Sequence, residues 1–235
     1  MSEPIRRLLL VRHAQGSLGT YDYDRLSKIG FRQAERVGRY LEAEAEEATM
    51  VRGELKRHRQ TAEYLGHLGA CRTDADLNEY RVDHLLEAAF LRADELALEA
   101  PGPAALADPV TYLDTFLELF PRVLEAWQTE RLDCSVNGCW SAFSQRVDAA
   151  GRRMALTLDE TGTVVAVTSA GVISTLAASL LGQDLAWQRN LNVTLYNASI
   201  TELRLDGPPG GSGRWSASRL NCVAHLPPGE LHTLA

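Results

Sequence analysis

Runs of apolar residues along the chain alternate with stretches in which apolar residues recur at helical spacing. Two runs, 8–11 and 163–168, are apolar or β-branched throughout and predict strands buried on both faces, as in a parallel sheet. Weaker strand candidates cover 49–55 and 71–77. The alternation predicts a three-layer α/β/α sandwich with a mostly parallel sheet.

Helices are predicted where apolar residues recur every three or four positions. The first begins after Ser27, a residue type that suits an N-cap. The other predicted helices cover 61–68, 140–158 and 170–181. Gly182 suits the C-cap of the last one. Two late strands, at about 199–205 and 214–220, flank glycine- and proline-rich residues and predict an antiparallel hairpin.

Residues 82–132 depart from this pattern, because helical stretches there surround the breaker-rich segment 101–109. Pro121 is expected to kink or split the second of these helices, since proline removes a backbone donor and clashes with the preceding turn. We expect residues 82–132 to form a helical cap inserted over the site, within a single domain that spans 1–235.

The composition narrows the class of partner. The chain has 235 residues, of which 45% are hydrophobic, enough for a sizeable core. Its formal net charge of −7 argues against nucleic acid or an anionic membrane surface as the main partner. No apolar run approaches membrane-spanning length, and residues 1–7 lack the apolar core of a signal peptide.

The four cysteines, Cys71, Cys134, Cys139 and Cys222, include no Cys-x-x-Cys pair. The simplest interpretation is a reduced, cytoplasmic chain with free thiols. A Cys134–Cys139 disulfide or a metal site stays open, on proximity alone.

Candidate chemistry begins directly after the first predicted strand, where Arg12 and His13 place a fixed cation beside an imidazole. In open α/β sheets, ligand chemistry collects at the carboxyl ends of the strands. A neutral histidine can attack phosphorus, and a guanidinium can hold phosphoryl oxygens through its planar donor fork. The alternative is a strand that simply ends in two solvated polar residues.

Three further polar residues follow other predicted elements: Arg57, Glu79 and Ser169. Two arginines that converge on a nucleophilic His13 would bind a phosphoryl group and offset its charge in the transition state. A carboxyl group kept protonated nearby would serve as general acid to the leaving oxygen. Each feature is weak alone, and the ordered set is a stronger signal.

With these residues the sequence resembles the histidine phosphatase superfamily, also called phosphoglycerate-mutase-like. The Arg-His-Gly-Glu/Gln motif of that family is matched with alanine in place of glycine. The matching segments are 12–15, 26–34, 53–62, 77–79 and 221–226. The similarity spans nearly the whole chain, apart from the middle insertion and the glycine-rich hairpin.

The resemblance implies a covalent mechanism. His13 would attack phosphorus and carry the phosphoryl group, which water would then release. Arg12 and Arg57 would bind the phosphoryl oxygens, and Glu79 would protonate the leaving group and later activate water. The ligand would be a small phosphorylated substrate or inorganic phosphate, and no metal or organic cofactor is implied.

Other polar groups are expected near this pocket. Gln15 and Ser17 would add neutral donors, and Ala170 would offer a backbone N–H at the start of a helix. His58 either reaches the pocket and replaces a missing cation or lies at the surface, which its basic neighbours favour.

The main departure from the family pattern lies at Ser169, where the family carries a second catalytic histidine. A charge-assisted hydrogen bond contributes roughly 1.5–3 kcal/mol, so its loss would slow turnover by about one to two orders of magnitude. Ser169 either donates a hydroxyl to the substrate or simply caps the following helix.

The leading hypothesis is a phosphomonoester hydrolase that works through a phosphohistidine at His13. One alternative is a phosphoglycerate mutase, although the loss of the second histidine disfavours two-way transfer. Another is a binding protein that keeps the anion pocket and has lost efficient turnover. The cap residues 82–132 are expected to set specificity, and a homodimer is left open.

Overall fold

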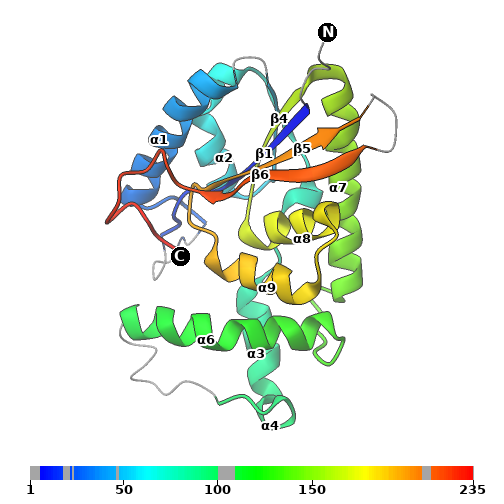
Figure 1. Ribbon diagram of the computed structural model, residues 1–235. Coiled ribbons are helices and arrows are strands. Elements are labelled where there is room, and N and C mark those ends of the chain that lie inside the picture. The colour runs from blue at the N-terminus through cyan, green and yellow to red at the C-terminus, as the bar shows by residue number, and fades with distance from the viewer. Residues whose placement is uncertain are drawn as a thin grey trace.

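The fold is built around one six-stranded sheet (Figure 1). The computed structural model describes residues 6–17, 22, 24–45, 48–99, 109–207 and 213–234. The strands are β1 (Arg6–Arg12), β2 (Thr49–Arg52), β3 (Cys71–Thr73), β4 (Thr163–Thr168), β5 (Ile200–Asp206) and β6 (Arg214–Cys222). Their order in the sheet is β3-β2-β4-β1-β5-β6, so the first strand of the chain lies inside the sheet.

The strand directions confirm the predicted mostly parallel sheet and the late hairpin. β1 runs parallel to β4, and β2 runs parallel to both β3 and β4. β5 is antiparallel to β1, and β6 is antiparallel to β5. The carboxyl ends of β1, β2 and β4 therefore meet at one edge of the sheet, where the residues that follow each strand come together.

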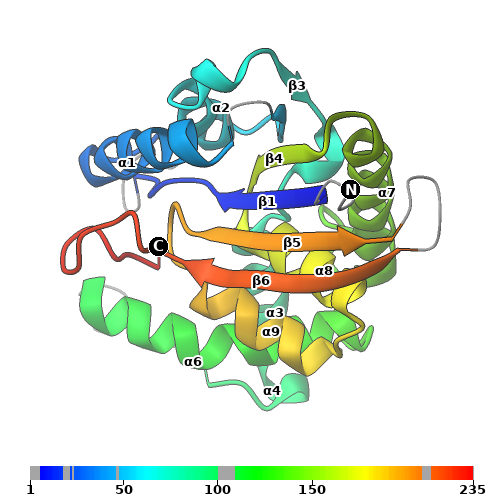
Figure 2. The same cartoon turned by 45° about the horizontal axis from the view of Figure 1, so that its top comes forward.

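Helices cover both faces of the sheet (Figure 2). They are α1 (Lys28–Glu44), α2 (Lys56–Glu63), α3 (Val82–Leu91), α4 (Ala93–Leu96), α6 (Pro109–Gln128), α7 (Trp140–Thr161), α8 (Ala170–Leu181) and α9 (Leu185–Thr194). Successive side chains of a strand point to opposite faces. Leu9 and Val11 of β1 accordingly pack in the hydrophobic cluster with α1 and α2. Leu8 and Leu10 join the cluster formed with α7, α8 and α9.

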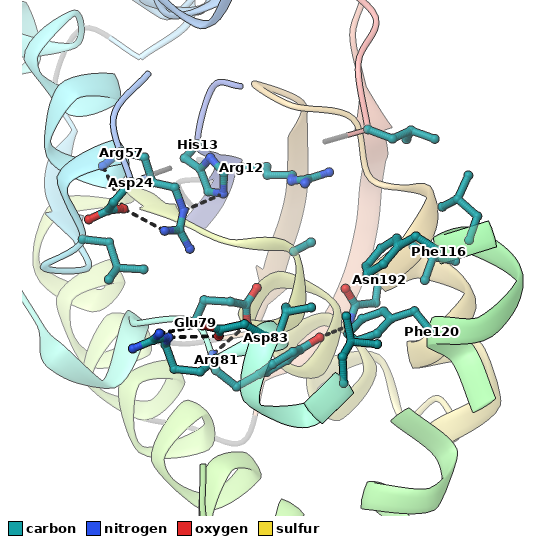
Figure 3. A pocket seen from close by; sticks show the side chains of 18 residues that line it. Arg12, His13, Asp24, Arg57, Glu79, Arg81, Asp83, Phe116, Phe120 and Asn192 are labelled. Atoms are coloured by element: carbon teal, nitrogen blue, oxygen red, sulfur yellow. Dashed lines mark hydrogen bonds and ion pairs between the residues drawn. The ribbon is translucent and has the colours of Figure 1, made fainter. Parts of the chain in front are cut away.

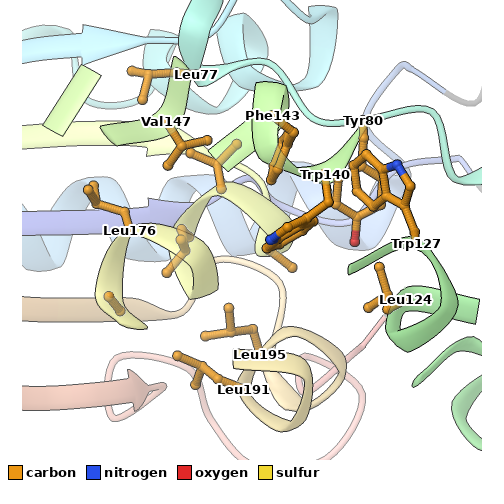
Figure 4. Close-up of a cluster of buried hydrophobic side chains, with 14 of the residues drawn as sticks. Leu77, Tyr80, Leu124, Trp127, Trp140, Phe143, Val147, Leu176, Leu191 and Leu195 are labelled. Atoms are coloured by element: carbon orange, nitrogen blue, oxygen red, sulfur yellow. The ribbon is translucent and has the colours of Figure 1, made fainter. Parts of the chain in front are cut away.

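An aromatic group ties α6 to the rest of the fold (Figure 4). Trp127 of α6 is fully buried, and its ring meets those of Tyr80 and Trp140 edge-on, with centroids 5.2 and 5.1 Å apart. Trp127 Nε1 also donates to the Gly138 carbonyl at 2.9 Å. Figure 1 shows α3, α4 and α6 together at one end of the molecule, next to α9. That 82–132 form an insertion within a single domain stays a prediction.

The structure corrects two predicted helix limits. α6 is not split at Pro121, because Phe120, Val123 and Leu124 around it are buried and this packing outweighs the missing backbone bond; a kink there stays a prediction. The helix predicted over 61–68 begins at Lys56 instead, where the backbone N–H donates to Asp24 Oδ2 at 2.8 Å. Arg57 therefore lies in the first turn of a helix rather than in a loop.

Other differences are smaller. β3 ends at Thr73, and residues 75–77 form a 3₁₀ turn instead of continuing the strand. α9 was not predicted at all. β4 and α8 match their predicted limits, and Gly182 takes the left-handed C-cap conformation with φ 64°. The loop predicted over 101–109 lies outside the described residues, except that residue 109 begins α6.

All four cysteines are free, so the Cys134–Cys139 disulfide is not formed. The reduced compartment stays a prediction. Within the described ranges, no helix is long and apolar enough to span a bilayer.

A buried carboxylate joins three strands away from the site. Glu202 of β5 is fully buried. It forms ion pairs with Arg7 of β1 at 3.1 Å, Arg219 of β6 at 3.1 Å and Arg204 at 3.3 Å. Burial opposes its ionisation, but the hydrogen bond and charge of Arg7 and the charge of Arg219 outweigh burial and lower the pKa of Glu202. The ionised form is therefore the one that stabilises the sheet.

We expect Glu202→Gln to lower the free energy of unfolding by roughly 2–3 kcal/mol at pH 7, because charged donors lose their buried partner. Since the folded-state pKa is lowered, the loss is complete above the unfolded value of about 4.3 and shrinks as the pH falls through the folded-state pKa. Urea unfolding at several pH values measures it. Glu44→Gln is the matched control. Glu44 also forms an ion pair with Arg219, but its side chain is 36% exposed, so this ion pair contributes less than about 1 kcal/mol to the free energy of unfolding. Equal losses in the two variants would contradict the prediction.

Candidate functional site

A cavity of about 650 Å³ opens at the carboxyl edge of the sheet (Figure 3). The end of β1 contributes Arg12 and His13, the first turn of α2 contributes Arg57, and the loop before α3 contributes Glu79. The helices α3, α6 and α9 line much of the rest of it. With Ala170 at the start of α8, the structure thus brings five of the predicted site residues together.

His13 is buried, with 4% of its surface exposed. Its backbone N–H donates to the Thr168 carbonyl at 2.8 Å, which ties the ends of β1 and β4 together. Its Nδ1 lies 2.8 Å from the Ala14 carbonyl oxygen. A carbonyl only accepts, so Nδ1 carries the proton and the lone pair is on Nε2. Nε2 accepts from Arg57 Nε at 3.1 Å.

The imidazole of His13 is kept neutral by its surroundings. Burial foremost, and then the charges of Arg57 and Arg12, hold its pKa well below the ordinary value of 6.5. At neutral pH the Nε2 lone pair is therefore available as a nucleophile.

Asp24 orients Arg57. Its Oδ1 accepts from Arg57 Nη1 at 2.7 Å, while its Oδ2 accepts from the backbone of Lys56 at 2.8 Å. One carboxylate thus satisfies the start of α2 and holds the guanidinium that contacts His13 (Figure 3). Asp24 was missed in the sequence, because it belongs to no motif segment and pairs with residues more than thirty positions away.

Arg12 lies on the other side of the histidine. Its guanidinium donates to the Leu195 carbonyl, and its backbone N–H donates to the Ser199 carbonyl at 3.0 Å. Arg12 and Arg57 therefore approach the cavity from two different elements, with His13 between them in Figure 3.

Glu79 is held by backbone donors. Oε2 accepts from Gly171 N, in the first turn of α8, at 2.8 Å, and Oε1 accepts from Tyr80 N at 3.2 Å. Burial raises its pKa above the ordinary value, although these hydrogen bonds and the charges of Arg57 and Arg146 act in the opposite direction. A β-carbon on Gly171 would lie 2.3 Å from Glu79 Oε1, so only glycine leaves room for this carboxyl.

The loop that carries Glu79 is fixed from two elements. Arg146 of α7 donates to the carbonyls of Asp76 and Asn78 at 2.6 and 2.7 Å. Thr168 Oγ1, at the end of β4, donates to the Leu77 carbonyl at 2.6 Å. The position of Glu79 is therefore set by the sheet and α7 together.

His58 and Ser169 form a buried pair behind the cavity. His58 is fully buried, which overturns the expected surface position, and its Nε2 lies 2.7 Å from Ser169 Oγ. The ring centroid of His58 is 5.6 Å from that of His13. Burial, and then the charges of Arg57 and Arg52, lower the pKa of His58, so this imidazole is neutral. Neither residue lines the cavity.

The remaining predicted residues are placed differently. Ser169 occupies the N-cap position of α8, but its side chain caps no backbone donor. Ala170 lines the cavity. Gln15 Oε1 instead accepts from Ser27 Oγ at 2.7 Å, at the start of α1. Ser17 lines a second hollow beside α1 and not this cavity.

Several lining residues come from elements that carried no motif. Asn192 belongs to the unpredicted helix α9, and its Nδ2 donates to the hydroxyl of Tyr80 at 2.8 Å. Phe116 and Phe120 come from α6. The sequence had indicated this part of the lining only through the expectation that residues 82–132 form a helical cap. No group of three or more metal-ligating side chains gathers among the residues that the structure describes.

The model of the histidine phosphatase superfamily (branch 1) matches residues 8–102 and 111–222. No curated protein sequence matches the chain significantly.

Solved structures share the fold. A mycobacterial glucosyl-3-phosphoglycerate phosphatase matches with a TM-score of 0.62 and 25% identity, over 92% of this chain and 98% of that one. Bacillus stearothermophilus YhfR matches with a TM-score of 0.63 and 22% identity, over 93% and 98%. A protein described as mycobacterial hydrolase 2 matches with a TM-score of 0.65 and 24% identity, over 92% and 91%. The mycobacterial phosphatase also matches in its complexes with inorganic phosphate and with VO3.

We expect Ser169→His to lower the free energy of unfolding by about 1–3 kcal/mol, because the new imidazole overpacks a site that already holds His58. Combining it with His58→Ala makes room and restores part of the loss. Ser141→His, at an exposed serine, is the control for the substitution itself. Thermal or urea unfolding of the four proteins measures this. A single Ser169→His variant as stable as the wild type would refute the steric conflict.

Proposed function

The chain belongs to the histidine phosphatase superfamily, and on that premise we propose that it hydrolyses phosphate monoesters of a small molecule through a phosphohistidine at His13. The observation that carries the proposal is the contact between the Nε2 lone pair of a neutral, buried His13 and the guanidinium of Arg57. It puts a nucleophile and a phosphoryl-binding cation at one point of a cavity.

In the first step, the Nε2 lone pair attacks phosphorus and the ester P–O bond breaks. The Nε–H of Arg57, which donates to this lone pair in the structure, turns to a phosphoryl oxygen. Arg12 supplies the second guanidinium. Glu79 gives its proton to the departing oxygen, which leaves as a neutral alcohol.

In the second step, water attacks the phosphorus of the phosphohistidine. The Glu79 carboxylate takes a proton from that water, and the P–N bond breaks. Inorganic phosphate leaves, Nε2 regains its lone pair, and Glu79 is again protonated. Nδ1–H stays bound to the Ala14 carbonyl throughout, so the ring keeps its orientation.

The two pKa shifts support this assignment of roles. The first step needs a neutral histidine and a protonated glutamic acid at the same time. With ordinary pKa values of about 6.5 and 4.3, less than about 1% of the molecules would hold that combination at any pH. Burial lowers the pKa of His13 and raises that of Glu79. Both shifts bring the two pKa values closer together, which enlarges the productive fraction.

Hydrolysis is favoured over a mutase reaction by the names of two of the similar structures, a glucosyl-3-phosphoglycerate phosphatase and a hydrolase. A requirement for bisphosphoglycerate would favour the mutase instead. Ser169 supports the alternative of a binding protein with weakened turnover, since its hydroxyl faces His58 and not the cavity.

The direct test is phosphate release from 4-nitrophenyl phosphate and benzyl phosphate. We expect wild-type turnover of both and its loss, by at least about 10³-fold, in His13→Ala, because no other group then forms the covalent intermediate. His67→Ala is the matched control, at an exposed histidine outside the cavity, and should keep full activity. Acid quench of the wild type should trap an acid-labile phosphoryl group. Equal activity of His13→Ala and wild type would refute the proposal, and phosphate binding without any turnover would establish the binding protein.

The role of Glu79 predicts a dependence on the leaving group and on pH. Glu79→Gln should lower kcat/KM for benzyl phosphate by about 10²–10³-fold. It should have a much smaller effect on 4-nitrophenyl phosphate, whose leaving group needs no proton. In the wild type, kcat/KM for benzyl phosphate should fall as the pH rises through the raised pKa of Glu79, because the protonated form is the active one. That alkaline limb should be missing in Glu79→Gln. Equal effects on both esters would exclude Glu79 as the general acid.

A further inference from the structure

The cavity has two unlike halves. Arg12, His13 and Arg57 form the half at the carboxyl edge of the sheet. The opposite half is built from aliphatic and aromatic side chains of the helices. Its apolar residues are Val82, Leu86, Phe116, Leu117, Phe120 and Val193. Figure 3 shows Phe116 and Phe120 across the cavity from Arg57 and Asp24.

Other polar groups of the lining pair with one another. Arg81 forms a two-point contact with Asp83, with Nε–Oδ1 and Nη2–Oδ2 distances of 3.1 and 2.6 Å. The Asn192 amide donates to the hydroxyl of Tyr80 at 2.8 Å. Of the lining side chains that the structure describes, Arg81 is the one guanidinium outside the phosphoryl half, and Asp83 already balances its charge.

The aromatic residues of this half pack against one another. The rings of Phe116 and Phe120 are stacked, with centroids 4.7 Å apart and planes 18° from parallel. The ring of Tyr80 lies 6.4 Å from that of Phe120. Such a surface binds planar or aliphatic groups by excluding water, and it gives a carboxylate no partner to replace its hydration.

We propose that the substrate is a phosphate monoester of an uncharged, apolar alcohol or phenol, with a flat ring that packs on Phe116 and Leu86. This inference rests on the proposed function, because the phosphoryl group must lie at His13 for the rest of the molecule to reach the apolar half. Esters that carry a second anionic group, such as a phosphorylated hydroxy acid, are poor ligands of this cavity.

Binding tests the inference without turnover. 2-Phenylethylphosphonate and 3-phosphonopropionate carry the same phosphonate on the same two-carbon linker and differ in a phenyl ring against a carboxylate. Calorimetry at pH 7 should give at least tenfold tighter binding of the phenyl compound. Equal affinities, or tighter binding of the carboxylate, would overturn the assignment of substrate class.

The chain offers a matched pair of variants on α3. Leu86→Ala should weaken the binding of 2-phenylethylphosphonate by about tenfold, because it removes apolar contact in the far half of the cavity. The affinity for inorganic phosphate should not change. Leu91→Ala is the control, since Leu91 lies on the same helix and is 82% exposed. Phe116→Ala, at a partly buried side chain, gives an independent variant with the same expected pattern.

The outcomes separate the two proposals. Absence of phosphate release from benzyl phosphate, with a clear preference for the phenyl phosphonate, would refute the hydrolase and leave the ligand class standing. Turnover that depends on His13 but prefers 3-phosphoglycerate to benzyl phosphate would refute the ligand class and leave the hydrolase standing. Equal effects of Leu86→Ala and Leu91→Ala on the phenyl compound would also overturn the apolar subsite.

Discussion

The hydrogen bond from Arg57 Nε to His13 Nε2 is the interaction on which the site depends. It joins the end of β1 to the first turn of α2, and it requires an unprotonated imidazole nitrogen. The Ala14 carbonyl fixes the proton on Nδ1, while Asp24 holds the other side of the guanidinium and satisfies the start of α2. Burial keeps the ring neutral, so the same packing that builds the fold leaves a lone pair on Nε2 of His13.

Two glycines, Gly53 and Gly171, make room for the side chains of His58 and Glu79. A β-carbon on Gly53 would lie 2.3 Å from His58 Nδ1, and one on Gly171 would lie equally close to Glu79 Oε1. The first allows a second imidazole to lie behind His13, hydrogen-bonded to Ser169, and the second allows a carboxyl group to meet the start of α8. The two glycines therefore shape the surroundings of the site, because neither carries a side chain that would fill the space.

The sheet and the helices around it contribute different residues to the cavity. The carboxyl edge of the parallel strands gathers the charged residues, because several strands end there side by side. The helices α3 and α6 add the apolar wall, which is continuous with the aromatic core around Trp127 and Tyr80. The charged residues of the cavity therefore lie on the sheet and the start of α2, and its apolar residues lie on helices at one end of the fold.

The sequence alone determined the features that local signals encode. β4 was predicted to the residue and the end of α8 to within about one residue, because a β-branched run and a glycine C-cap act within a few positions. The order of Arg12, His13, Arg57 and Glu79 along the chain also indicated the site. Only the tertiary structure decided the start of α2, the burial of His58 and the partner of Ser169. These depend on Asp24 and on packing between segments far apart in the chain, and such contacts leave no periodic pattern in the sequence.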